Sequence, residues 1–368
     1  MNDPSMELAI RNVVRLLTLA GSCGTAWLGS AACSGAEGPA GGAEQVEMRV
    51  AGEAAALPAL PGAAVDLSAL DVHGYLHDES GFRLIDAPDG PGRTYAVSLN
   101  RKGEIVGTYL DGEGLAHGFL RHADGTFETI DHPDGETTFL HRINDRGQIV
   151  GVYHETVASP RQGFIRDGGS YISVTVSGAE ATDANSINER GQVIGWYQMK
   201  GDPTSYAHGM IWENGSVTTI DIPESSTAPI DINEAGVVVG FYVQPPAIED
   251  LDDVVVASAF VIQDGKTTRF TVPGYPYGSA NGLNNRQGPD GAAQIVGGAY
   301  EVLAGGGGLG DGFVQPEGLG GPFVLEQVPG AEFTETFDIT DCGQIVGSFA
   351  LTGEPSIPPP EGVIAGCE

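Results

Sequence analysis

One motif recurs six times along the chain, and its spacing limits the folds that the chain can adopt. Each copy has an apolar residue, an asparagine or a substitute for it, a few polar residues, a glycine, a short apolar run and a second glycine. Such regularity is typical of a repeat architecture in which each copy is one structural unit. The second glycines, 44 to 57 residues apart, are Gly107, Gly151, Gly195, Gly240, Gly297 and Gly347.

A second motif alternates with the first. In "HGFLRHADGTFETID" (117–131) and "HGMIWENGSVTTID" (208–221), two apolar segments flank an Asp-Gly or Asn-Gly pair, and such pairs favour tight hairpin turns. One unit therefore contains four short strands, which is the content of a propeller blade. We predict an all-β fold, a β-propeller of about six four-stranded blades with about 44–50 residues each. A β-solenoid-like repeat array is the alternative.

The ends of the chain predict how the ring closes. The last unit lacks its outer strand, which the early segment "FRLID" (82–86) can supply. "EGVIAG" (361–366) is expected to pair with the preceding "QIVGSF" as the next strand of the same blade. That hairpin would bring Cys342 next to Cys367, and an exported protein would join them in a disulfide.

The first 65 residues precede the repeats and differ from them in composition. Residues 1–33 combine two arginines with a moderately apolar, small-residue run that ends at Cys33, as in a secretory signal or a bacterial lipoprotein signal lipidated at that cysteine. Residues 34–65 are rich in alanine, glycine and proline, as flexible linkers are, and residues 66–368 are the predicted propeller domain. We expect a secreted, periplasmic or bacterial cell-surface protein, with the lipid anchor as its only contact with a membrane.

The chain is strongly acidic, with a formal net charge of −32 from 49 acidic and 17 basic residues. Such a surface repels phosphate groups, so nucleic acid is not an expected partner. An unidentified extracellular protein or a glycan is expected instead. No nucleotide-binding loop followed by a helix and no nucleophile motif is recognisable in the sequence. Catalytic and ligand-binding residues are therefore not assigned, and an enzyme is the less favoured interpretation.

The asparagines of the first motif are interpreted as turn residues. An asparagine caps a tight turn with its side chain, and a glycine three residues later adopts positive φ at low cost. A ring of calcium sites is the alternative, but these loops lack the dense acidic pattern of a calcium cage. The charged residues between Asn and Gly are expected to be solvated. The predicted turn residues are Asn100, Gly103, Asn144, Gly147, Asn188, Gly191, Asn233 and Gly236.

One acidic loop, "IEDLDD", is a weak candidate for a metal site, with Ca²⁺ as the ion that its carboxylates favour. A solvated acidic loop is the favoured interpretation. Its acidic residues are Glu249, Asp250, Asp252 and Asp253. Equivalent histidines at the start of the second motif are expected to have a repeated packing or hydrogen-bonding role. These are His73, His117 and His208.

The two motifs together resemble the HAF family of bacterial extracellular repeat proteins, whose repeat combines a His-(Ala/Gly)-Phe-Leu strand with an "IN..G.IVG.Y" hairpin. The segments 117–131 and "RINDRGQIVGVY" (142–153) carry the resemblance, which extends over residues 73 to 366. It implies a secreted or surface-attached, propeller-like protein and no particular reaction. Some copies depart from the pattern, with Gln162, Ser258 and Asp311 in place of the histidine.

The expected function is that of an exported or surface-anchored repeat protein that presents a ligand- or protein-binding surface. A propeller enzyme that acts on glycans as a hydrolase or lyase is one alternative, and a calcium-stabilised structural or adhesion protein is the other. A binding or catalytic pocket needs residues that differ between blades, because residues repeated in every blade serve the common scaffold. Positions that break the repeat are therefore where function is expected.

Overall fold

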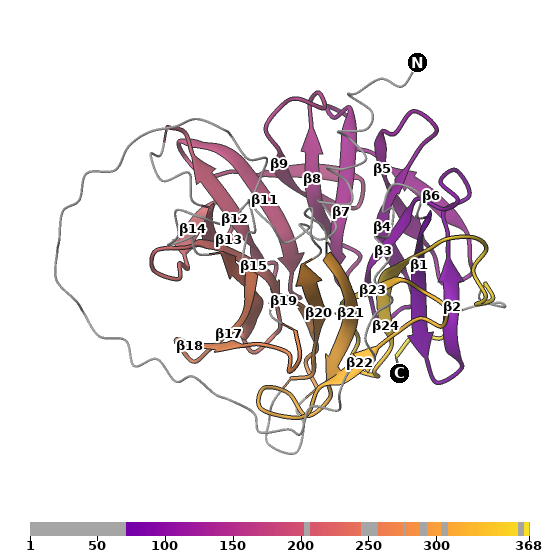
Figure 1. Cartoon of the computed structure of the whole chain (residues 1–368). Coiled ribbons are helices and arrows are strands. Elements are labelled where there is room, and N and C mark those ends of the chain that lie inside the picture. The colour runs from indigo at the N-terminus through magenta and orange to yellow at the C-terminus, as the bar shows by residue number, and fades with distance from the viewer. Residues whose placement is uncertain are drawn as a thin grey trace.

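The computed structural model describes residues 71–201, 207–243, 257–275, 277–286, 293–302, 308–359 and 364–367. These residues form 24 strands in six antiparallel four-stranded sheets. The sheets are arranged as blades around a common axis (Figure 1), so the predicted six-bladed propeller is confirmed. The described part of the chain contains no helix long and apolar enough to cross a membrane.

The first strands of neighbouring blades contact one another all around the ring, which places them innermost. Blade 1 consists of β3 (Thr94–Leu99), β4 (Ile105–Leu110), β5 (Ala116–Arg121) and β6 (Phe127–Ile130). Blade 2 consists of β7 (Thr137–Ile143), β8 (Ile149–His154), β9 (Gln162–Asp167) and β10 (Ser170–Val174). Blade 3 consists of β11 (Ala179–Ile187), β12 (Val193–Met199), β13 (Ala207–Glu213) and β14 (Ser216–Thr219).

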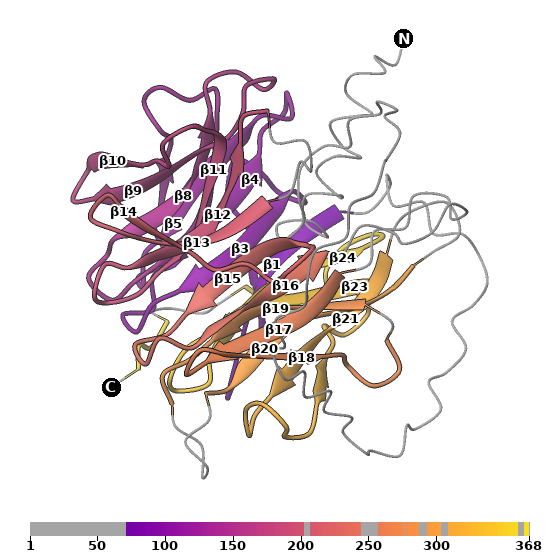
Figure 2. The same ribbon diagram turned by 90° about the vertical axis from the view of Figure 1, so that its left-hand side faces the viewer.

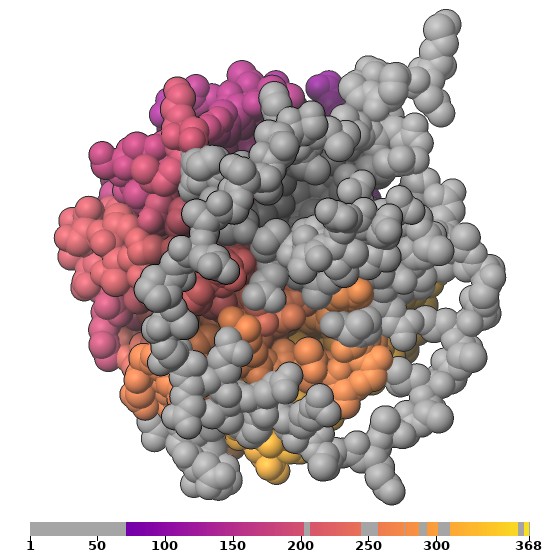
Figure 3. Space-filling view, turned by 60° about the vertical axis from the view of Figure 1, so that its left-hand side comes forward, coloured from indigo at the N-terminus to yellow at the C-terminus, as the bar shows by residue number. Residues whose placement is uncertain are grey.

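The next two blades have the same strand order, and Figure 2 shows them (orange) below blades 1 to 3 (indigo to pink). Blade 4 consists of β15 (Ser226–Ile232), β16 (Val238–Val243), β17 (Ala257–Gln263) and β18 (Lys266–Phe270). Blade 5 consists of β19 (Tyr277–Leu283), β20 (Ile295–Val302), β21 (Gly308–Gln315) and β22 (Val324–Glu326). In Figure 3, blades 3 and 4 (pink and orange) follow one another around the ring.

Blade 6 joins the two ends of the propeller. Its inner strands are β23 (Phe333–Ile339) and β24 (Ile345–Leu351), and its outer strands are β1 (Asp71–Asp78) and β2 (Gly81–Ile85). The expectation that "EGVIAG" would be the third strand was wrong, because β1 pairs with β24 instead. Tyr75 and Leu76 are adjacent in β1, so they lie on opposite sides of the sheet, and both are completely buried. β1 therefore buries more apolar surface than the short "EGVIAG" segment can.

The C-terminal residues 352–359 and 364–367, here called the C-terminal strap, take another route. The backbone N–H of Leu84 in β2 donates to the carbonyl of Pro358 (2.7 Å), so the strap contacts the outer strand of blade 6. Its end is held by a disulfide between Cys367 and Cys342, the latter in the turn between β23 and β24. The predicted disulfide is therefore confirmed, although the strand pairing from which it was predicted is not present.

The repeated glycines allow close approach of two strands within each blade. A Cβ atom added to Gly151 in β8 would lie 2.0 Å from the carbonyl oxygen of Phe139 in β7. The five equivalent glycines meet the inner strand at 1.9–2.2 Å in the same way. No side chain fits at such distances, so glycine is required at this position in every blade.

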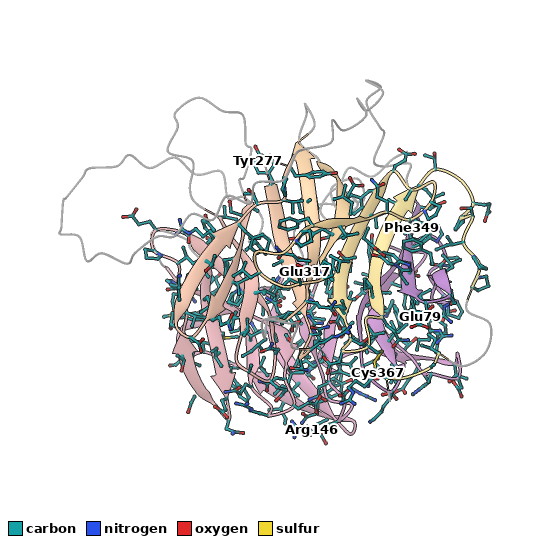
Figure 4. All side chains as sticks on the ribbon, turned by 90° about the horizontal axis from the view of Figure 1, so that it is seen from below. Glu79, Arg146, Tyr277, Glu317, Phe349 and Cys367 are labelled. Carbon is teal, nitrogen blue, oxygen red and sulfur yellow. A yellow bond between two sulfur atoms is a disulfide. The ribbon has the colours of Figure 1, made fainter. Side chains whose placement is uncertain are left out.

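The ring has two distinct faces. The turns between the first and second strands of the blades lie on one of them, the turn face, and the inner strands begin on the opposite one, the loop face. Arg146 in a turn of blade 2 and Tyr277 at the start of β19 lie at opposite edges of the ring in Figure 4. In blades 1 to 5, the second and third strands are connected on the loop face, where the connections differ in length between blades.

Turns on the turn face have the asparagine-capped geometry that their sequence favours. Asn144 Oδ1 accepts hydrogen bonds from the backbone N–H groups of Arg146 (3.1 Å) and Gln148 (2.9 Å), and Gly147 has φ +85°. Asn144 Nδ2 also donates to the carbonyl of Asn188 in the next blade (3.3 Å). The same side chain therefore shapes one turn and ties it to its neighbour.

Candidate ligand site at the propeller axis

Every inner strand has a β-bulge at the same place. In β7, Leu140 pairs with Gly151 and Arg142 pairs with Val150, which leaves His141 as the extra residue. A bulge increases the local twist and changes the direction of the side chain that it carries. We call the six extra residues the bulge ring: Val97, His141, Asn185, Ile230, Asn281 and Phe337.

The bulge ring is not repeated from blade to blade, in contrast to the turn asparagines and the glycines of the second strands. It contains three apolar residues, two asparagines and one histidine. Although these residues belong to the innermost strands, Val97, His141 and Ile230 are only half-buried, and the His141 side chain is 18% exposed. Solvent therefore reaches the inner strands at this level.

One residue beyond the bulge toward the turn face, Arg142 links four blades. Its guanidinium forms ion pairs with Asp231 of blade 4 (2.9 Å) and Asp338 of blade 6, and donates to the carbonyl of Asn281 in blade 5 (3.2 Å). Burial acts to lower the pKa of Arg142, but the two carboxylates outweigh it and raise that pKa. Buried ion pairs thus cross the axis on the turn-face side of the bulge ring.

The two aspartates of this ion-pair cluster have further partners. Ser98 Oγ donates to Asp338 (2.7 Å), and Ser186 Oγ donates to Asp231 (2.6 Å). Burial raises the pKa of Asp231; Arg142 opposes this rise and the charge of Asp338 reinforces it. Hydrogen bonds from neighbouring blades therefore help to keep two close carboxyl groups inside the ring.

Two residues before the bulge, blade 3 carries the buried Asp183. Its carboxylate pairs with Arg161 (2.8 Å) and lies 3.3 Å from Nδ1 of His141, the bulge-ring residue of blade 2. Burial acts to raise the pKa of this carboxyl group, but His141 and Arg161 outweigh burial and lower it to about 2. His141 Nδ1 is also 3.1 Å from the carbonyl oxygen of Ala184.

The equivalent position of blade 6 carries Glu335, which is also buried. Its Oε1 accepts hydrogen bonds from the hydroxyl of Tyr300 (2.5 Å) and from Nδ2 of Asn281, the bulge-ring residue of blade 5 (3.1 Å). Burial raises the pKa of Glu335 to about 8, although both hydrogen bonds act to lower it. At neutral pH, Glu335 is therefore protonated while Asp183 is ionised.

The metal and lipidation candidates from the sequence are not tested by these contacts. Within the described ranges, no group of three His, Cys, Asp or Glu side chains could hold a metal ion. The candidates that lie outside the described residues are Glu249, Asp250, Asp252, Asp253 and Cys33, together with the signal (1–33) and linker (34–65) segments.

Each of the equivalent histidines of the second motif has an aspartate as its partner. His117 Nδ1 lies 2.8 Å from Asp131, at the end of the outer strand of its blade, and its ring stacks on Tyr109. His73 with Asp86 and His208 with Asp221 have the same distance. These histidines link the third strand of a blade to the segment that follows the fourth.

The axial residues His141, Arg142, Asp183 and Glu335 were not predicted from the sequence. A signal was present, because the residues before each "IN" or its substitute vary while the residues around them repeat. The loops between the second and third strands of the fourth and fifth units also break the repeat. Their central residues, 244–256 and 303–307, lie outside the described part of the chain.

Comparisons with known proteins give only distant structural similarities. No protein-family model and no curated protein sequence matches the chain. Among solved structures, a putative TolB from Agrobacterium tumefaciens has 11% identity and a TM-score of 0.45, covering 77% of this chain and 99% of that chain. AofleA from Arthrobotrys oligospora has 10% identity and a TM-score of 0.42, with 70% and 79% covered. The β-propeller domain of the Trilobed protease from Pyrococcus furiosus has 11% identity and a TM-score of 0.40, with 71% and 82% covered.

Proposed function

We propose that this protein is an exported repeat propeller of the HAF type that binds a ligand at the loop-face end of its axis and catalyses no reaction. The observation that carries the proposal is the bulge ring, which has five different residue types in its six positions and is partly open to solvent at Val97, His141 and Ile230. Repeated scaffold residues need not vary, whereas a site for an asymmetric ligand requires different side chains around it.

The surroundings of the bulge ring support a binding site of defined depth. On the turn-face side, the ion pairs of Arg142 cross the axis. On the loop-face side, Asp183 and Glu335 each contact a bulge-ring residue of the preceding blade. A few fixed polar groups among apolar side chains is the usual composition of a small-molecule site.

The disulfide at the end of the strap supports export. The disulfide between Cys342 and Cys367 is of a kind that persists in oxidising compartments and is rare in the cytosol. The acidic composition, at a formal net charge of −32, disfavours binding to nucleic acid. A periplasmic or extracellular location, with a protein or glycan ligand, agrees with both features.

A binding screen with the full chain tests the proposal. Labelled protein is applied to an array of glycans and to a library of extracellular proteins, in parallel with Ile230→Arg and His141→Ala variants. The matched control is Arg146→Ala on the turn face. We expect a ligand whose affinity falls at least tenfold in the two axial variants and is unchanged in the control. Failure to find any ligand, or equal affinity in all correctly folded variants, would overturn the proposal.

A glycan-cleaving enzyme is the second candidate, and one observation favours it. Asp183 and Glu335 occupy equivalent positions with opposite ionisation, and hydrolysis of glycosidic bonds uses one protonated and one ionised carboxyl group. Incubation with polysaccharides should then release new reducing ends, and Glu335→Gln should abolish the release. Absence of product from every polysaccharide would reject this candidate.

A further inference from the structure

Two buried carboxyl groups flank the bulge ring from opposed blades. Asp183 belongs to blade 3 and Glu335 to blade 6, three blades apart in the ring of six. Their equivalence is structural, because the carbonyl oxygens of both residues face the repeated glycine of the adjoining strand at 1.9–2.0 Å from its added Cβ. Because glycine has no side chain, the two strands approach each other closely at this point in both blades. Asp183 and Glu335 therefore lie at the same height along the axis.

Each of these carboxyl groups has one oxygen with spare hydrogen-bonding capacity. Glu335 Oε2 and Asp183 Oδ1 are buried and have no hydrogen bond of normal geometry within the described residues. Asp183 Oδ1 has only the imidazole of His141 nearby, at 3.3 Å. A buried polar atom without a partner costs free energy, and a bound polar molecule would supply the missing partner.

Neither arginine near the axis is available to an anionic ligand. Arg142 is paired with two carboxyl groups, Asp231 and Asp338, and Arg161 is paired with Asp183. Among the described residues of this site, an anionic ligand would therefore find carboxyl groups and already paired guanidinium groups. A cationic ligand would have to compete with two buried guanidinium groups for their carboxylates. Displacement of either guanidinium group is costly, because it would leave a buried charge unpaired.

The available groups therefore favour a neutral ligand that both donates and accepts hydrogen bonds. An ionised Asp183 accepts, a protonated Glu335 donates, and a hydroxyl group can serve either. Half-buried Val97, Phe139 and Ile230 add apolar surface on the inner strands. Such a combination suits a ligand with hydroxyl groups at its edge and a hydrocarbon face.

We infer that the ligand of the axial site is an uncharged carbohydrate, with hydroxyl groups bonded to Asp183 and Glu335 and an apolar face packed on Phe139. This inference rests on the proposed binding function and names its ligand class. Glu335 acts here as a hydrogen-bond donor, so a neutral glutamine should replace it with little loss, whereas an alanine should not.

The test compares three classes of oligosaccharide on the full chain by titration calorimetry: neutral, sulfated or uronic, and amino-sugar oligomers. Neutral oligomers should bind to the native protein. Affinity should change less than threefold in Glu335→Gln, and should fall at least tenfold in Glu335→Ala and in Phe139→Ala. Arg146→Ala on the turn face is the matched control and should bind as the native protein does.

The pH profile supplies a readout that a merely structural role would not change. Affinity should fall above pH 8 in the native protein, because Glu335 then loses its proton, and should not fall in Glu335→Gln. The titratable groups near Glu335 are Tyr300 and Tyr75, with Glu326 and its partner His77 close to Tyr75. All of them are present in both proteins, so the comparison isolates Glu335.

Two results would overturn the inference. One is binding of charged oligosaccharides only, and the other is binding of neutral oligosaccharides with equal affinity in every axial variant. If no oligosaccharide binds while an extracellular protein binds and depends on His141 and Ile230, the carbohydrate inference fails and the axial binding function stands.

Discussion

The carboxylate of Asp145 accepts a hydrogen bond from the backbone N–H of Arg101 on the neighbouring blade, at 2.7 Å. The next blade repeats the relationship, since Glu189 accepts from the N–H of Asp145 at 2.6 Å. Glu234 in turn accepts from the N–H of Glu189 at 2.5 Å. These carboxylates, which the sequence analysis interpreted as solvated, therefore connect the blades along the turn face.

Removal of this connection should weaken the ring. In Asp145→Ala, the Arg101 N–H loses its acceptor on the neighbouring blade, and we expect a loss of about 1 kcal/mol in the free energy of unfolding. Arg146→Ala removes an exposed ion pair with Glu189 (3.6 Å) and should cost well under 0.5 kcal/mol, roughly the value of a surface pair. Urea unfolding of both variants checks the order, and equal losses would contradict it.

The two glycines of "RGQIVG" should differ strongly in their response to alanine. Gly147 has φ +85° and open space around it, so alanine there should cost about 1 kcal/mol of backbone strain. Gly151 has a carbonyl oxygen 2.0 Å from its added Cβ, so alanine should separate two strands and cost about 3 kcal/mol or more. Thermal unfolding measures both, and a Gly151→Ala protein as stable as Gly147→Ala would disprove the close approach.

Substitution of Arg142 alone should lower the free energy of unfolding strongly, whereas its substitution together with both aspartate partners should lower it little. Arg142→Met leaves Asp231 and Asp338 as buried, unpaired carboxyl groups, and we expect a loss of about 3–5 kcal/mol at neutral pH. Additional Asp231→Asn and Asp338→Asn substitutions should restore most of that stability, because no buried charge then remains. Urea unfolding of the single and triple variants decides between this electrostatic cause and a loss of packing, which the triple variant would not repair.

The disulfide should contribute to the closure of blade 6. Its cysteines are 25 residues apart, and replacement of both by serine should lower the free energy of unfolding by about 2–4 kcal/mol. Because the strap contacts β2, hydrogen exchange should increase first at the N–H of Leu84. An unchanged exchange rate at β1 and β2 would show that the strap does not support the closing strands.

Glu335 should make the protein less stable as the pH rises. Its pKa is about 8 in the folded protein, against 4.5 as the ordinary value, so the folded state retains a proton that the unfolded state has lost between these values. The resulting stability is complete below 4.5 and is lost as the pH rises through 8. Between pH 5 and pH 9, Glu335→Gln should therefore gain on the order of 3 kcal/mol relative to the native protein.

Asp183 acts in the opposite direction and in another range. Its pKa is lowered from 3.8 to about 2, so its contribution is present above 3.8 and is lost as the pH falls toward 2. Measurements between pH 5 and pH 9 avoid that range. A constant stability difference between the native protein and Glu335→Gln across these pH values would refute the raised pKa of Glu335.

Much of the architecture could be predicted because it depends on local chemistry. Asn144 and Gly147 specify a turn within five residues, and Gly151 specifies a close approach to the adjacent strand. The same motif recurs along the chain, so one predicted blade implies six. The disulfide between Cys342 and Cys367 was also predicted correctly, although from a strand pairing that β1 replaces in the structure.

The axial site could not be predicted, since its residues meet only when the ring is complete. Arg142, Asp231 and Asp338 belong to blades 2, 4 and 6, and no sequence spacing relates them. Closure was predicted in part: "FRLID" is the outer strand of blade 6, as expected, whereas the third strand was mispredicted. Both "EGVIAG" and β1 are apolar segments near an end of the chain, and only the burial of Tyr75 and Leu76 against the rest of blade 6 distinguishes them.

Blade 6 also sets an order of events for a chain made from its N-terminus. β1 and β2 are synthesised first, but their partner β24 comes last. Until then, blades 1 to 5 can stack only as an incomplete arc with unpaired edges, a form that associates readily with other chains. A prematurely terminated chain remains in that state. The ring therefore closes only after β24 has been made, so a closed ring contains all six blades.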